Sequence, residues 1–172
     1  ELAKTIPNIN LDIVYTVAAF HDAGLIYDRE NHHLNSANFV LKDKHLNKWF
    51  QQDDIKIIAE AVEDHRAHYE PRNIYGQIIS DADKSVDLKD ILIRTHLGIK
   101  SKFPDKNLET FEAEFNAAYD WILKKDSEKG YMKFYLDDDK KKALIILHNL
   151  VKNKDYIKKE YYKIYKESDY NE

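Results

Sequence analysis

The scarcity of turn-forming residues restricts the fold of this chain more than any other feature. Only 4 Gly and 3 Pro occur among its 172 residues. A sheet of many strands needs tight turns, and glycine and proline supply most of the backbone conformations that such turns require. Apolar residues nevertheless make up 43% of the chain, enough for a sizeable core, which excludes intrinsic disorder for most of its length. The sequence therefore predicts an all-α fold.

Apolar residues recur at helical spacing along the whole chain. No internal repeat, low-complexity stretch or long linker interrupts this pattern, which favours a single domain over residues 1–172. We expect Asp53 to cap one helix and Gly98 to close another. Helices are predicted at about 11–21, 31–40, 46–50, 53–65, 74–83, 87–96, 108–125, 137–151 and 155–167.

Composition and charge exclude several classes of protein. The absence of cysteine excludes disulfides, thiolate metal sites and cysteine nucleophiles, and it fits the cytoplasm. Neither a membrane span nor a signal peptide is readable in the hydropathy pattern. Acidic residues outnumber basic ones in residues 1–123, whereas residues 124–172 are basic. An acidic main body argues against a nucleic acid as the partner.

Ionisable side chains fall on the apolar stripes of three predicted helices. His21 and His65 each lie three and seven residues after apolar residues of their own helix, and Asp22 follows His21 directly. Asp81 and Asp83 end another apolar helix. Burial of such groups costs several kcal/mol each unless it is compensated. A divalent metal ion supplies compensation, and imidazole and carboxylate ligands suit Fe, Mn, Zn or Co.

Three segments carry a family resemblance. In Val17–Gly24 a His-Asp doublet is followed by Ala and Gly, and this segment resembles the doublet of the HD-domain superfamily of metal-dependent phosphohydrolases. Glu63–Ala67 and Ile78–Lys84 resemble helices that follow the doublet in that superfamily, in the same order. The resemblance implies one HD-like helical domain, with a metal-site core over about residues 1–100 and accessory C-terminal helices over about 101–172.

The resemblance also implies a set of metal ligands. It assigns His21, Asp22 and Asp83 to one metal ion. In members with two metal ions further histidines follow the doublet, and these map onto His32 and His65. The implied cofactor is one or two divalent ions per chain, drawn from Mn, Fe, Zn, Co and Mg. Asp22 would also act in catalysis, by positioning or deprotonating the attacking water.

Two assignments have a neighbouring alternative. His32 stands four residues before Ser36, the offset at which the superfamily's ligand precedes its pair of small residues, so we prefer it to His33. Asp83, directly before Lys84, fits the superfamily's late aspartate better than Asp81. We therefore expect Asp81 to be a neighbour that supports the site.

The sequence departs from the superfamily at its first ligand, a histidine on the helix before the doublet. No histidine precedes His21. Glu1–Lys4 resembles the end of that helix, so we expect the natural protein to begin further upstream, unless the ligand has been lost. Loss of this ligand would weaken metal binding. The alternative function is then a catalytically silent HD-type module that binds a metal ion or a nucleotide.

The preferred function is a metal-dependent phosphohydrolase that cleaves a phosphate ester of a small molecule or nucleotide by metal-activated water. Arg66, Arg72 and Lys84 are placed to bind the anionic substrate, because Arg offers a planar fork and Lys a point charge to phosphate. Their alternative partners are the acidic residues of segment 63–70. No membrane or nucleic-acid partner is expected, and a homo-oligomer is compatible with the sequence.

Overall fold

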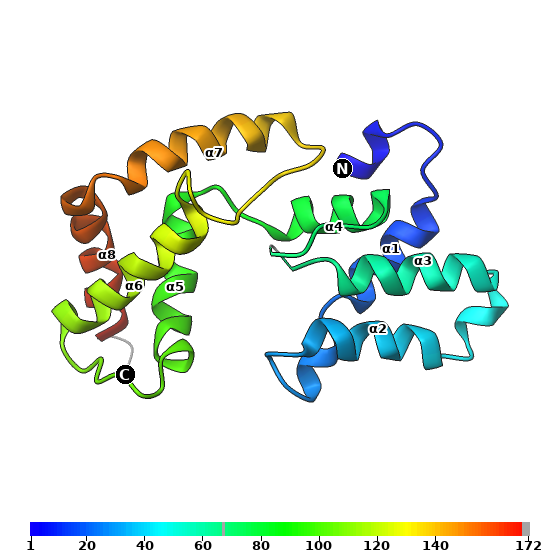
Figure 1. The fold of residues 1–172 in the computed structure, drawn as a ribbon, viewed down its shortest axis with the longest axis horizontal. Coiled ribbons are helices and arrows are strands. Elements are labelled where there is room, and N and C mark those ends of the chain that lie inside the picture. The colour runs from blue at the N-terminus through cyan, green and yellow to red at the C-terminus, as the bar shows by residue number, and fades with distance from the viewer. Residues whose placement is uncertain (67, 170–172) are drawn as a thin grey trace. The chain divides into compact units, whose positions relative to one another are not determined.

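The computed structural model describes residues 1–66 and 68–169, and this part of the chain forms helices and no strands. The predicted all-α fold is thus confirmed. Two compact units can be distinguished, one formed by residues 1–84 and 133–138 and the other by residues 85–132 and 139–172 (Figure 1). The expectation of one domain stays a prediction. Ala67, the last residue of the Glu63–Ala67 motif, lies outside the described residues.

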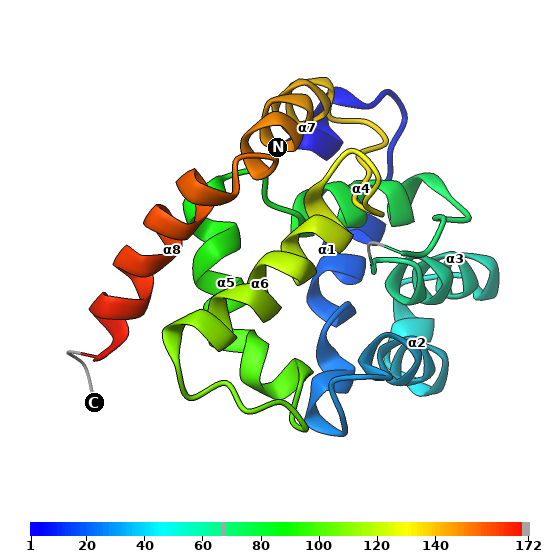
Figure 2. The ribbon, with the colours of Figure 1, turned by 60° about the vertical axis from the view of Figure 1, so that its left-hand side comes forward.

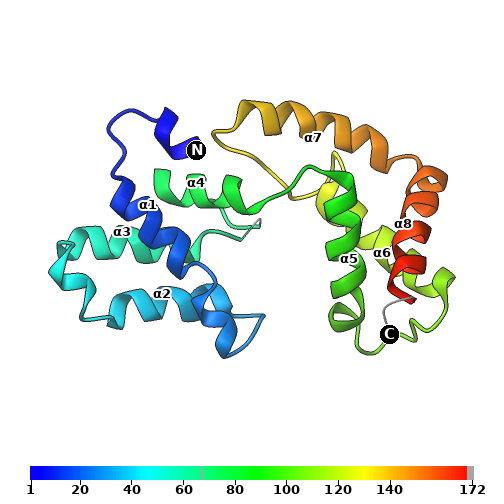
Figure 3. The same ribbon diagram turned by 180° about the vertical axis from the view of Figure 1, so that it is seen from behind.

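The first unit is a group of four α-helices with short 3₁₀ turns between them. Helices α2 and α3 run side by side, and α1 and α4 both pack on α3, as the front and rear views show (Figure 1, Figure 3). Their shared core includes Val17, Val40 and Ile58, which are almost completely buried. The elements are η1 (Leu2–Thr5), α1 (Leu11–Phe20), η2 (Ala23–Ile26), α2 (His32–Lys42), η3 (Leu46–Lys48), α3 (Gln52–Glu63) and α4 (Ile74–Asp83).

Polar side chains determine where these helices begin. The Asn10 side chain accepts hydrogen bonds from the first turn of α1, as a good N-cap residue does. The predicted cap of α3 was wrong: Gln51 is the N-cap, and the Asp54 carboxylate accepts a hydrogen bond from its backbone N–H at 3.2 Å. Asp53 lies inside the first turn instead. Because the four consecutive residues 51–54 are all acidic or amide residues, which suit a helix start, composition alone could not select the N-cap among them.

Helix α2 is held against the segment that follows α1. The N–H of Gly24 donates a hydrogen bond to Ser36 Oγ at 2.7 Å, and both residues are buried. A Cβ atom on Gly24 would collide with the carbonyl oxygen of His32 and would lie 2.7 Å from the backbone nitrogen of Ser36. Only glycine permits this approach, which brings the start of α2 next to the His21-Asp22 doublet.

The second unit contains α5 (Leu88–Lys102), α6 (Phe111–Asp126), α8 (Lys154–Asp169) and, apart from its first residue, α7 (Asp138–Val151). Helices α6 and α8 both pack against α5 (Figure 2). Gly98 does not close α5, contrary to prediction: the helix continues through it to Lys102. An interior glycine costs about 1 kcal/mol relative to alanine, a cost that the complete burial of Ile99 on the same helix can offset.

Substitution of Gly24 tests the contact between η2 and α2. Gly24→Ala should lower the free energy of unfolding by roughly 1–3 kcal/mol, because the new methyl group overpacks against the α2 backbone. Gly98→Ala is the matched control. No atom lies within 4 Å of the Cβ that it adds, so it should stabilise the protein by about 0.5–1 kcal/mol. Urea denaturation of both variants measures the difference in the free energy of unfolding. Equal effects of the two substitutions would contradict the close contact between Gly24 and the α2 backbone.

A buried acid in the second unit predicts a pH dependence of stability. Asp126 is 1% exposed, and within the described residues neither of its carboxylate oxygens has a hydrogen-bond partner, although Lys125 Nζ lies 4.0 Å from Oδ1. Burial raises the pKa of Asp126 from 3.8 to about 6. The folded state therefore binds this proton more tightly than the unfolded state, so stability contributed by the neutral acid is lost as the pH rises from about 4 to about 6.

Asp126→Asn should remove that loss. The substitution should raise the free energy of unfolding more at pH 8 than at pH 4. The difference between the two pH values should be on the order of 2–3 kcal/mol. Urea denaturation at the two pH values measures it. An equal effect at both values would show that Asp126 titrates normally in the folded protein.

Candidate metal centre

Three histidines and one aspartate converge in the first unit. His21 is the C-cap residue of α1 and Asp22 follows it, His32 is the first residue of α2, and His65 comes just after α3. Asp22 Oδ1 lies 3.3 Å from His32 Nε2 and 3.7 Å from His65 Nε2. Asp22 Oδ2 lies 3.6 Å from His21 Nε2. The Asp22 carboxylate is thus surrounded by three imidazole rings, and its side chain remains 48% exposed.

Backbone hydrogen bonds fix the orientation of all three rings. The Nδ1 atom of each of His21, His32 and His65 lies 2.6–2.8 Å from the backbone carbonyl oxygen three residues earlier in the chain. A carbonyl oxygen can only accept, so each Nδ1 carries the proton. In the neutral rings the lone pair is then on Nε2, the atom that faces Asp22.

This arrangement fits a divalent cation. Nε2 of His32 and Nε2 of His65 are 3.1 Å apart, and two lone pairs at that distance repel each other unless a proton or a cation lies between them. Together with Asp22 they form the one group of three or more His or acidic side chains, within the described residues, whose ligand atoms lie within 4.8 Å of one another. Two imidazoles and a carboxylate suit Zn, Fe, Mn or Co. His21 lies at the edge of this group.

The electrostatic environment keeps His65 available as a ligand. Burial lowers the pKa of His65, and the neighbouring rings of His21 and His32 lower it further. The hydrogen bond to the carbonyl of Val62 and the charge of Asp83 act in the opposite direction. Because the net pKa shift is downward, the His65 ring stays neutral at pH 7, as a metal ligand must.

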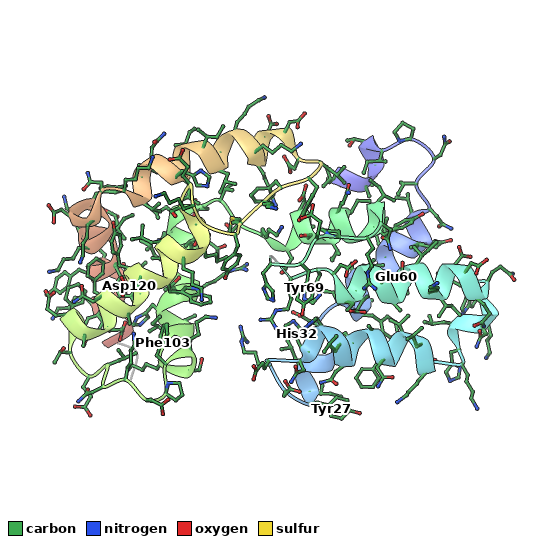
Figure 4. All side chains as sticks on the ribbon, viewed as in Figure 1. Tyr27, His32, Glu60, Tyr69, Phe103 and Asp120 are labelled. Atoms are coloured by element: carbon green, nitrogen blue, oxygen red, sulfur yellow. The ribbon has the colours of Figure 1, made fainter. Side chains whose placement is uncertain are left out.

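The structure separates His32 from His33. His33 is 3% exposed, but its Nε2 lies 3.1 Å from the hydroxyl of Tyr69 and does not face Asp22. Burial and the nearby charge of Arg66 lower the pKa of His33 to about 4, so its ring is neutral. Figure 4 labels His32 at the start of α2 and Tyr69 in the connection between α3 and α4. The contact between His33 and Tyr69 could not be predicted, because no pattern in the sequence pairs residues 36 positions apart.

The two aspartates at the end of α4 have different surroundings. Asp83 is the last residue of the helix, is exposed, and influences His65 through its charge, but it lies outside the close group of three ligands. Asp81 is completely buried, and its carboxylate accepts hydrogen bonds from the backbone N–H groups of residues 135–137. A carboxylate held by peptide groups in this way is a structural anchor.

The three cations expected to bind substrate also differ. Arg66 donates from Nη1 to the carbonyl of Glu30, beside the cluster. Arg72 holds the buried carboxylate of Asp64 through Nε at 2.9 Å and Nη2 at 2.8 Å, as the alternative pairing predicted. Lys84 is 7% exposed and donates to a backbone carbonyl at 2.6 Å. Arg72 and Lys84 thus have partners within the protein, and their role in substrate binding stays a prediction.

Comparison with known proteins gives one match. The family model described as HD domain matches residues 1–86, which is half of the chain. No curated protein and no solved structure matches the chain. Within residues 1–66 and 68–169, none of the helices combines the length and apolar content needed to cross a membrane. The matched residues include all four members of the cluster.

Adjacent histidines provide a matched test of the metal centre. His32→Gln should lower the affinity for Mn²⁺ or Zn²⁺ by roughly tenfold or more, because it removes one of two closely spaced Nε2 ligands. His33→Gln should leave the affinity unchanged, because His33 faces Tyr69. Isothermal titration with each metal ion measures both affinities. A loss confined to His33→Gln would contradict the choice of His32.

Proposed function

The chain belongs to the HD domain family, and from that premise we propose that it is a metal-dependent phosphohydrolase that cleaves a phosphate ester of a small molecule or nucleotide. The observation that carries the proposal is the set of three imidazole Nε2 atoms directed at one half-exposed carboxylate. Because each ring is already oriented by its own backbone hydrogen bond, little reorganisation accompanies metal binding. The proposal includes a cytoplasmic location.

Asp22 is the residue best placed to act on a water molecule. Its carboxylate bridges His21 on one oxygen and His32 and His65 on the other, yet it remains accessible to solvent. A divalent cation held there supplies Lewis acidity, which lowers the pKa of water and neutralises charge on phosphoryl oxygens. Asp22 would orient the attacking water and hold its proton. His21, His32 and His65 would keep their Nε2 lone pairs directed at the cation.

Arg66 is the residue that we assign to substrate. Its Nη1 is fixed on the carbonyl of Glu30, which orients the guanidinium, while Nε and Nη2 have no hydrogen-bond partner within the described part of the chain. Arginine binds phosphate through two parallel N–H groups when the geometry permits. A small phosphorylated molecule or nucleotide bound beside the cluster would therefore meet one oriented cation.

The alternative is a catalytically silent HD module that binds a metal ion or a nucleotide. The position of Asp83 outside the close ligand group favours it. Both functions require the same cluster, so metal binding alone does not distinguish them. Release of phosphate from a panel of phosphate esters does, with Mn, Fe, Zn, Co and Mg supplied in turn.

Two substitutions separate metal binding from substrate binding. Asp22→Ala should lower metal content and turnover together, because it removes both the central carboxylate and the proton acceptor. Arg66→Ala should retain metal but weaken substrate capture by about 1.5–3 kcal/mol, the contribution of one charge-assisted hydrogen bond. Metal stoichiometry and steady-state phosphate release measure both effects.

Asp12→Ala is the control for this comparison, because Asp12 is an exposed carboxylate at the other end of α1. It should change neither quantity. Full metal content and full turnover in Asp22→Ala would contradict the assignment of the doublet. A protein that binds metal but releases no phosphate from any ester would support the silent module instead.

A further inference from the structure

A segment far along the chain completes the first unit. Lys133–Asp138 leads from the connection after α6 into the first residue of α7, well beyond the residues that match the family model, yet it belongs to the same compact unit as α1–α4. The Asp81 carboxylate accepts the N–H groups of Tyr135 at 2.9 Å, Leu136 at 2.7 Å and Asp137 at 3.0 Å. Three consecutive peptide groups thus converge on one side chain of α4.

These hydrogen bonds make Asp81 and the segment depend on each other. Asp81 is 0% exposed, and a buried carboxylate is costly unless donors replace the water that it has lost. The peptide N–H groups of the 133–138 segment are those donors. Release of the segment would leave a buried acid without them, so the final turn of α4 and the segment should be ordered together.

Lys84 forms a second anchor on the other side of Asp83. Its Nζ donates to the carbonyl oxygen of Lys133 at 2.6 Å and lies 5.6 Å and 5.2 Å from the ring centres of Phe134 and Tyr135. Asp83 therefore sits between two residues, Asp81 and Lys84, that are both fixed by the same segment. Its carboxylate is close enough to His65 to act on it electrostatically.

The segment also contacts the connection between α3 and α4. The Tyr135 hydroxyl lies 3.4 Å from the carbonyl oxygen of Tyr69, to which it can donate, and Lys133 Nζ lies 3.5 Å from a carboxylate oxygen of Glu70. Tyr69 in turn contacts His33, the neighbour of His32 in α2. The same six residues thus contact both the end of α4 and the connection between α3 and α4.

From this geometry we infer that Asp81 is a positioning residue for the metal centre: by binding the 133–138 segment it fixes the end of α4 and holds Asp83 beside His65. The inference rests on the proposed function, because it assumes that the cluster binds a divalent cation. Asp83, placed in this way, adds negative charge next to the close ligand group. Residues outside the family match would then help to determine the affinity of the site.

Asp81→Asn tests the inference, with Asp126→Asn as its matched control. Both substitutions replace a buried carboxylate by an amide, but Asp126 lies in the second unit. Asp81→Asn should lower the Mn²⁺ affinity roughly tenfold, and the amides of residues 135–137 should exchange hydrogen faster. Asp126→Asn should change neither quantity. Lys84→Gln, which keeps most of the side chain, should weaken Mn²⁺ binding in the same direction if Asp81→Asn does not fold.

The effect of Mn²⁺ on hydrogen exchange distinguishes a positioning role of Asp81 from a purely structural one. If the segment and the metal site are coupled, Mn²⁺ must slow hydrogen exchange at residues 135–137 of the unmodified protein, since coupling is reciprocal. Unchanged Mn²⁺ affinity in Asp81→Asn and Lys84→Gln, or exchange at 135–137 that does not respond to Mn²⁺, would overturn the inference. Failure of the unmodified protein to bind any divalent ion would instead refute the proposed function on which it rests.

Discussion

The hydrogen bond from each histidine Nδ1 to a carbonyl three residues earlier is the interaction on which the site depends. It uses the one ring nitrogen that could otherwise compete as a ligand, and it leaves Nε2 of His21, His32 and His65 directed at Asp22. Because the accepting carbonyls belong to helix ends and turns, the orientation of each ring follows directly from the backbone. Any change that frays these helix ends would therefore rotate the rings.

The first unit stabilises its buried acids in two different ways. The Asp64 carboxylate accepts hydrogen bonds from the guanidinium and from the backbone N–H of Arg72. The positive charge of Arg72 thus compensates the negative charge of Asp64. Asp81 accepts hydrogen bonds from the peptide N–H groups of residues 135–137, so backbone donors replace the water that this buried carboxylate has lost. The first arrangement closes the connection that follows His65. The second ties the last turn of α4 to residues 135–137.

The sequence was sufficient to predict most helices and the convergence of His21, Asp22 and His65, because helical periodicity places residues on a face before any tertiary contact is known. It was insufficient where a residue's partner is distant. The spacing of Arg72 and Lys84 fits substrate binding and ion pairing equally well, and only the fold shows Arg72 on Asp64 and Lys84 on the carbonyl of Lys133. Gly98 does not end α5, because the burial of Ile99 can offset the low helix propensity of glycine.

The boundary of a domain depends on whether it is drawn from sequence pattern or from contacts. The family match ends at residue 86, but the contacts of Asp81 extend the unit to residues 133–138. The hydrogen bonds to Asp81 come from peptide N–H groups of this segment, which residues of different types can supply. Substitutions within it can accumulate without loss of the anchor, provided that the backbone conformation is kept. The family match thus leaves out a part of the first unit that supplies hydrogen bonds to the buried Asp81 carboxylate.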